Sequence, residues 1–171
     1  MNPVRLYDYL SQARARLFDW IRPLRQEQYT QEFPFGLHTL RATMIEIALI
    51  EWFYGLRLRG DEPPPREDGP ISEERQPTFR DLEAIWTELA SGTRALLAEI
   101  VDWDTPIKWR TSQSGRPIIV LASRGDIAAQ MCFHEVHHRA QAMAMLRQLG
   151  IAAQDLDYSF YMFQYHRDSI Q

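Results

Sequence analysis

Apolar residues recur at steps of three and four along four long segments of the chain, a spacing that places them on one face of an α-helix. The first segment begins with Pro3 at the first helical position and ends near Pro23. The second runs from about Thr39 to Arg59 and ends before Gly60. Because this segment is apolar on nearly all sides between Met44 and Tyr54, it predicts a central helix.

The other two long helices are each predicted to begin at a capping residue. Thr78 is followed three residues later by an aspartate, and the apolar pattern then continues to Ile100. Ser123 starts the fourth long helix in the same way, and its pattern runs to Leu149. A short aromatic helix over about Asp157–Arg167 is predicted to close the chain.

Two stretches between the long helices lack helical periodicity. The segment Asp61–Pro77 is rich in proline and charge and predicts a long, exposed crossover loop between the second and third helices. Between Trp103 and Ala122, the segment Ser112–Gly115 predicts a turn that joins two short extended pieces. The pattern therefore predicts one all-α domain over residues 1–171, a four-helix bundle with a small extended insert before the fourth helix.

Composition and charge narrow the class of protein. The chain has 171 residues, 45% of them hydrophobic and 25% charged, and a formal net charge of −4, which is typical of a soluble globular protein and argues against nucleic-acid binding. The best membrane-span candidate, Met44–Tyr54, is too short and contains two glutamates. The start of the chain does not resemble a secretory signal, and Cys132, the one cysteine, fits a reducing cytosol. We therefore expect a cytoplasmic protein.

Two histidines occupy core-facing positions of the fourth long helix. His134 and His138 lie one turn apart, so their side chains point the same way from a stripe that otherwise carries apolar residues such as Met131 and Met145. Burying a polar side chain without a partner costs roughly 1–3 kcal/mol, so the pair needs a shared explanation. A divalent metal supplies one, because both imidazoles can reach the same ion. A hydrogen-bonded or surface pair is the alternative.

Glu46 places an anion inside the apolar part of the second helix. A buried carboxylate must be paired, protonated or bound to a metal. Two histidines on one bundle helix and a carboxylate on another make a three-ligand set with an open position, which is typical of catalytic sites. Gln141 and His137 are candidates for groups behind these ligands. The alternative for Glu46 is a buried ion pair with Arg41 or Arg139.

The segment His134–His138 also matches H-E-x-x-H, the peptidase motif in which a glutamate, here Glu135, acts as general base on a zinc-bound water. The surrounding sequence argues against a peptidase. His166, the one later histidine, lies in a polar stretch, and no well-formed strand edge is predicted on which a peptide could dock. Glu135 stays a candidate for a group that supports the metal ligands.

The segment His134–Gln141 is similar to the H-x-x-H-H-R-G-Q signature of the DinB/YfiT-like family of metal-dependent bundle proteins. Thr39–Ile45 resembles the segment that leads into the first metal histidine of that family, and Asp155–Tyr158 resembles its acidic and aromatic ending. The resemblance covers most of the chain.

This resemblance implies an up-up-down-down bundle, often a homodimer, with nickel or zinc held in a cleft by three ligands that are typically all histidine. His134 and His138 match two of these ligands. Glu46 stands where the third histidine belongs, and Ala140 replaces the signature glycine. Two histidines and a carboxylate can still hold zinc, and they also suit iron.

The resemblance also implies a function. Characterised relatives transfer low-molecular-weight thiols such as bacillithiol, and one is a mycothiol-dependent isomerase. The first hypothesis is therefore a metal-dependent enzyme that acts on a small molecule, with a thiol S-transferase as the specific form. The alternatives are a non-enzymatic, stress-related bundle with a degenerate metal site and a zincin-like metallohydrolase. A homodimer is also expected, because the second helix is more apolar than one buried face requires.

Overall fold

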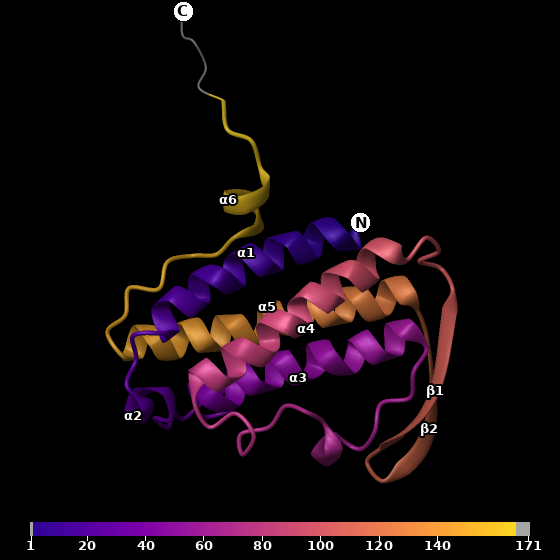
Figure 1. Cartoon of the computed structure of the whole chain (residues 1–171), viewed down its shortest axis with the longest axis horizontal. Helices are drawn as coiled ribbons and strands as arrows, with labels where there is room; N and C mark the ends of the chain where they lie inside the picture. The colour runs from indigo at the N-terminus through magenta and orange to yellow at the C-terminus, as the bar shows by residue number, and fades with distance from the viewer. Residues whose placement is uncertain (1, 167–171) are drawn as a thin grey trace, which may run out of the picture.

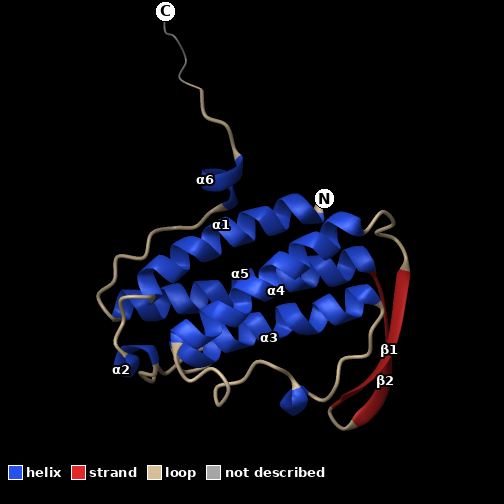
Figure 2. Ribbon diagram, viewed as in Figure 1, coloured by secondary structure: helices blue, strands red, loops and turns tan. Residues whose placement is uncertain are grey.

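Four long helices pack side by side in the computed structural model, which describes residues 2–166 (Figure 1). Their bounds are α1 (Pro3–Ile21), α3 (Leu40–Arg59), α4 (Phe79–Glu99) and α5 (Arg124–Gln148). Three short elements are the helices α2 (Gln26–Tyr29) and α6 (Tyr158–Met162) and the 3₁₀ turn η1 (Arg66–Asp68). An antiparallel hairpin of β1 (Pro106–Gln113) and β2 (Arg116–Ser123) precedes α5 (Figure 2). The predicted all-α bundle with a small extended insert is confirmed.

The predicted helix starts coincide with observed caps. The Thr78 side chain accepts a hydrogen bond from the amide of Asp81, whose carboxylate accepts one in return from the Thr78 amide. Ser123 and Asp126 make the same reciprocal pair at the start of α5. At the C-terminal end of α3, Gly60 adopts a φ of +90°. This backbone conformation favours glycine and ends the helix.

The end of the chain differs from the prediction. Helix α6 covers only Tyr158–Met162, because Phe163 is already extended, whereas a helix over Asp157–Arg167 was expected. Arg167 lies outside the described residues. Five residues make little more than one turn, too short to be stable on its own, and α6 is held by packing on α1.

The directions of the helices also differ from the expected up-up-down-down order. Ion pairs join Arg22 at the end of α1 to Glu83 near the start of α4, and Asp8 near the start of α1 to Arg94 of α4, so these helices are antiparallel. Helices α1 and α5 run one way, and α3 and α4 run the other, giving an up-down-down-up order (Figure 1). The physical reason is that an up-up-down-down bundle needs two long crossovers, and this chain has one, between α3 and α4.

The crossover follows α3 closely instead of lying free in solvent. Three ion pairs fasten it along the helix: Arg57 with Glu62, Arg66 with Glu46, and Arg41 with Glu73. Ile71 is 2% exposed, and Gly69 packs so closely that a Cβ there would lie 3.2 Å from Leu49 and 3.3 Å from Trp52. Only parts of the segment are therefore exposed, contrary to the expectation for the whole loop.

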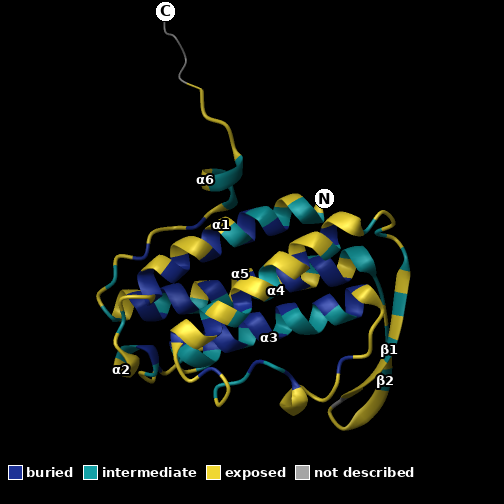
Figure 3. Cartoon of the chain, viewed as in Figure 1, coloured by how far each residue is buried: buried dark blue, intermediate teal, exposed yellow. Residues whose placement is uncertain are grey.

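Buried residues gather on the inward faces of the four long helices, and none of the hairpin residues whose burial the structure describes is buried (Figure 3). Among the described residues, no helix is long and apolar enough to cross a membrane. Cys132 is buried, as predicted, and burial raises the pKa of its thiol to about 12.

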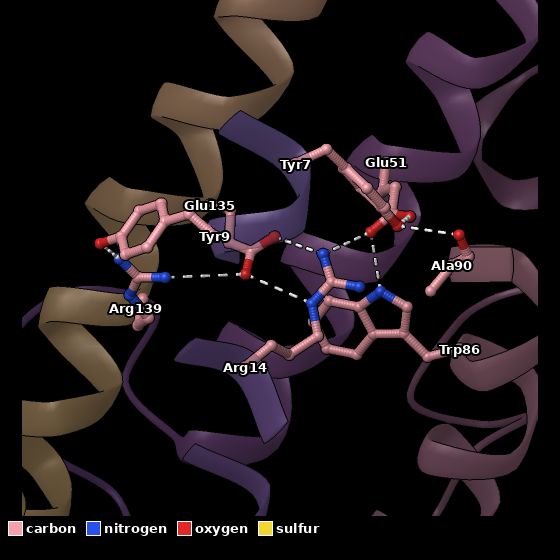
Figure 4. A network of polar contacts seen from close by, with 8 residues as sticks. All are labelled: Tyr7, Tyr9, Arg14, Glu51, Trp86, Ala90, Glu135 and Arg139. Carbon is pink, nitrogen blue, oxygen red and sulfur yellow. Dashed lines mark hydrogen bonds and ion pairs between the residues drawn. The ribbon is translucent and has the colours of Figure 1, made fainter. Parts of the chain in front are cut away.

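One charged cluster lies inside this apolar core. The guanidinium of Arg14 in α1 lies between the carboxylates of Glu51 in α3 and Glu135 in α5, 2.8 Å from the nearest Glu51 oxygen (Figure 4). Each of the three side chains is at most 5% exposed. Trp86 donates a hydrogen bond of 2.8 Å to Glu51, and its ring lies under the Arg14 guanidinium. Tyr7 donates to the other Glu51 oxygen.

The charges in this cluster depend on one another. Burial by itself would lower the pKa of Arg14, but the adjacent Glu135 and Glu51 carboxylates outweigh it and raise that pKa. Arg139 of α5 lies 4.0 Å from Glu135 and donates to the Tyr9 hydroxyl, so a second cation also faces this carboxylate. The Glu51 and Glu135 carboxylates are therefore buried away from solvent, and the Arg14 and Arg139 guanidiniums are the cations that face them.

Replacing Arg14 with methionine, which keeps the volume but removes the charge, is expected to destabilise the fold by about 3–5 kcal/mol, because it leaves buried carboxylates unpaired. Urea unfolding measures the change. Arg16→Met on the same helix, where the side chain is 48% exposed, is the matched control, and a change below about 0.5 kcal/mol is expected. Similar stability of the two variants would show that the buried ion pairs do not hold the bundle.

Candidate metal centre

The three residues singled out as metal ligands lie together between α3 and α5. Glu46, His134 and His138 each offer one ligand atom, and these atoms all lie within 4.8 Å of one another. The Nε2 atom of His134 is 3.6 Å from Glu46 Oε1, and the two imidazole rings are 4.5 Å apart. Antiparallel packing of α3 on α5 brings them together, because Glu46 projects toward the face of α5 that carries both histidines.

The protonation states of this cluster suit metal binding. The contacts with His134 and Arg66 lower the pKa of Glu46 to about 2, so the carboxylate is ionised at neutral pH. Burial lowers the pKa of His138, which keeps this imidazole neutral at neutral pH. An ionised carboxylate and a neutral imidazole are the forms that coordinate a metal ion.

Gln141 orients the His138 ring. Its side-chain oxygen accepts a hydrogen bond of 3.0 Å from His138 Nδ1, and its amide nitrogen donates to His137 Nε2 at 3.0 Å. Because the amide oxygen only accepts, His138 carries its proton on Nδ1, and the Nε2 lone pair is left for a metal. His137 itself is exposed, and it reaches the cluster through Gln141 and through its ring, whose centroid lies 4.9 Å from that of His138.

The loop before α3 packs closely against the Gln141 side chain at Gly36. Gly36 has a φ of +58°, and a Cβ at this position would lie 2.9 Å from the Gln141 side-chain oxygen. Glycine is therefore favoured here both by the backbone conformation and by the close approach of the glutamine.

The donor set fits a divalent transition metal. Two imidazoles and one carboxylate suit zinc or iron, and three protein ligands leave coordination positions for a substrate. The Nδ1 atom of His134 is buried and has no hydrogen-bond partner among the described residues, so only His138 has a group that fixes its ring from behind.

Glu135 lies elsewhere. Although it directly follows His134 in the sequence, its carboxylate is buried against Arg14 and is not part of the metal cluster. A general base must reach the reacting water, and this carboxylate is held by a guanidinium on another face of α5. The structure thus gives no support to the peptidase interpretation of the H-E-x-x-H match.

The sequence did not indicate the charged partner of Glu46. Arg66 in η1 contacts the Glu46 carboxylate, whereas the predicted partners lie elsewhere: Arg41 pairs with Glu73, and Arg139 binds Tyr9. Arg66 is separated from Glu46 by the end of α3 and part of the crossover, so no local pattern relates the two. Arg66 contacts both Glu46 oxygens, and Oε2 is the nearer one, since Nη1 lies 3.4 Å from Oε1. Oε1 also faces His134, so the ion pair and the candidate metal site share this carboxylate.

The fold is a helical bundle in which two histidines of one helix face a carboxylate of another. These features define the class of the protein as a candidate metal-binding helical bundle. The family model of the DinB family matches residues 1–168, and the chain belongs to that family. A similar relative is protein DinB of Bacillus subtilis (strain 168), which is 25% identical over 164 residues, covering 93% of this chain and 92% of the relative. The resemblance read from His134–Gln141 is therefore confirmed.

We expect the purified chain to bind about one divalent metal ion, and His134→Ala or Glu46→Gln to reduce its metal affinity by at least ~10-fold, because each removes a ligand. Elemental analysis of protein purified without a chelator or a histidine tag measures this. His38→Ala is the control, since that imidazole lies against the Phe33 carbonyl outside the cluster. Equal metal content in all four proteins would rule out the three-ligand site.

Gln141→Ala is expected to lower metal affinity by ~10–100-fold, as loss of an outer hydrogen-bond partner does, with little effect on folding. Competition with a chromophoric chelator gives the affinity. The exposed Gln148 of the same helix, replaced in the same way, provides the reference. An unchanged affinity for Gln141→Ala would mean that the ring of His138 does not need this support.

Proposed function

We propose that this protein is a divalent-metal-dependent enzyme that transfers a low-molecular-weight thiol to an electrophilic small molecule. The cluster of Glu46, His134 and His138 carries this proposal, because three ligands with an open position characterise catalytic metal sites rather than closed structural ones. Membership of the DinB family supports it.

A divalent ion bound here would lower the pKa of a thiol in the site, so that the sulfur is a nucleophile at neutral pH. In the transfer, the S–H proton passes to solvent and a carbon–sulfur bond forms. The bond between that carbon and its leaving group breaks, and the leaving group departs with the electron pair. No oxidant or reductant is needed.

The residues of the chain contribute binding and orientation. Glu46 supplies the one negative charge of the cluster, and Gln141 holds His138 in the tautomer that presents Nε2. Because one carboxylate cannot neutralise a divalent ion, the loaded site would keep a net positive charge and favour a thiolate over a neutral thiol.

A second candidate is a non-enzymatic bundle. The observation that favours it is the ion pair between Glu46 and Arg66, which gives the carboxylate a partner without any metal. In that case His134 and His138 would be a pair of imidazoles in edge-to-face contact inside a binding protein.

We also propose that the protein works in the cytoplasm as a homodimer. Cys132 is buried and unpaired, which suits a reducing compartment. Trp52, Phe53 and Tyr54 of α3 form a run of partly exposed aromatic side chains, a feature typical of interfaces.

Metal-loaded wild-type protein is expected to conjugate a small thiol to chlorodinitrobenzene, and His134→Ala or treatment with EDTA should reduce the rate at least ~100-fold, since transition-state stabilisation by the ion is lost. Product absorbance over a panel of thiols gives the rate. Gln148→Ala should keep the wild-type rate. Absence of turnover with every thiol, despite stoichiometric metal, would contradict the transferase and favour the binding protein.

A further inference from the structure

Arg66 pairs with Glu46 on the outer side of the candidate metal cluster. Its guanidinium contacts both carboxylate oxygens, with Nη1 3.4 Å from Oε1. The same Oε1 lies 3.6 Å from Nε2 of His134, on the side of the carboxylate that faces the other two candidate ligands. A metal ion bound to Oε1 would therefore lie beside the guanidinium, and two cations that share one carboxylate repel each other. The arginine and the metal ion compete for Glu46.

The ion pair is easy to break from the side of the arginine. The Arg66 side chain is 60% exposed, whereas that of Glu46 is 16% exposed. Such a pair contributes little to stability, because water can replace the carboxylate at the exposed guanidinium. A divalent ion held by three protein ligands is bound far more strongly. We therefore expect the metal ion to displace the arginine, and not the reverse.

The η1 turn that carries this arginine is held at both ends and exposed between them. Residues 64–68 are exposed, and they lie between the buried residues Pro63 and Gly69. Two short-range backbone hydrogen bonds form the turn, and the ion pair of Arg66 with Glu46 ties it to α3. Loss of that ion pair would therefore loosen this turn while the flanking parts of the crossover stay packed.

Free carboxylates line a cavity that Arg66 also lines. Glu67 and Glu74 lie with it around a space of about 520 Å³ between the crossover and α3. The ion pairs of the described residues include neither of these two carboxylates, whereas the neighbouring Glu73 is paired with Arg41. The acidic rim of the cavity thus offers the guanidinium a second position once it has left the metal cluster.

We propose that Arg66 competes with the metal ion for Glu46: it pairs with this carboxylate when no ion is bound, and it moves to the acidic rim of the cavity, loosening the η1 turn, when a divalent ion binds. The crossover then tunes the metal affinity, and by reciprocity the metal ion controls the conformation of the crossover. This inference rests on the metal site of the proposed function and not on the thiol transfer.

The first test compares the zinc affinity of the full chain with that of Arg66→Gln by competition with a chromophoric chelator at neutral pH. We expect the variant to bind zinc ~3- to 10-fold more tightly, the range of a partly exposed ion pair, where tenfold is about 1.4 kcal/mol. Arg66→Lys keeps the positive charge and should stay closer to wild type. Arg41→Gln removes another arginine that ties the crossover to α3, and as the matched control it should change the affinity less than ~2-fold.

The second test measures hydrogen exchange of the η1 turn by mass spectrometry, with and without zinc. In wild type, zinc should speed exchange in residues 63–69 by at least ~3-fold, because the turn loses its contact with α3. The segment around Glu73, which Arg41 holds, should not change. In Arg66→Gln the turn should exchange fast without zinc, and zinc should have no further effect.

Equal zinc affinity of wild type and Arg66→Gln would overturn the competition and leave the metal site intact. Weaker binding by the variant would also overturn it, since Arg66 would then position Glu46 for the metal ion. Exchange at the turn that zinc leaves unchanged or slows in wild type would overturn the release. If neither protein binds zinc, the metal site of the proposed function fails, and this inference fails with it.

Discussion

The ion pairs of Arg14 with Glu51 and Glu135 constrain three of the four long helices at once. A buried guanidinium must lie close to its carboxylates, because each charge has lost its hydration and only a well-aligned partner replaces it. The pairs therefore hold α1 against α3 and α5 at a fixed register and rotation (Figure 4). Apolar packing alone is less directional and would tolerate sliding of one helix past another.

The metal cluster depends on this constraint. Glu135 adjoins His134 on α5, and Glu51 follows Glu46 by little more than one turn of α3. Fixing the two glutamates on Arg14 fixes how far α3 and α5 are rotated, so Glu46 and His134 face each other on another side of the same helices. The crossover then adds Arg66 on the outer side of Glu46. The buried ion pairs that stabilise the bundle and the charged residues of the candidate metal site are thus positioned by the same two helices, α3 and α5.

Periodicity predicted the long helices closely, because caps and apolar stripes are local properties of the chain: Thr78, Ser123 and Gly60 act at their own positions. The sequence also predicted the three metal-ligand candidates, because a polar residue on an apolar helix face can be recognised within its own segment. Glu135 shows where prediction from a local sequence pattern fails. It completes an H-E-x-x-H match in sequence, yet adjacent residues on a helix point about 100° apart, and its carboxylate meets Arg14 instead of the cluster.

The sequence by itself determined the four long helices, their caps, the family and the three residues that gather between α3 and α5. Only the tertiary structure decided the direction of the helices, the burial of Arg14 between two glutamates, and the pairing of Glu46 with Arg66. Each of these joins residues far apart in the chain through the path of a loop or the rotation of a whole helix. Such contacts depend on how complete elements pack, and no pattern within a single element encodes them.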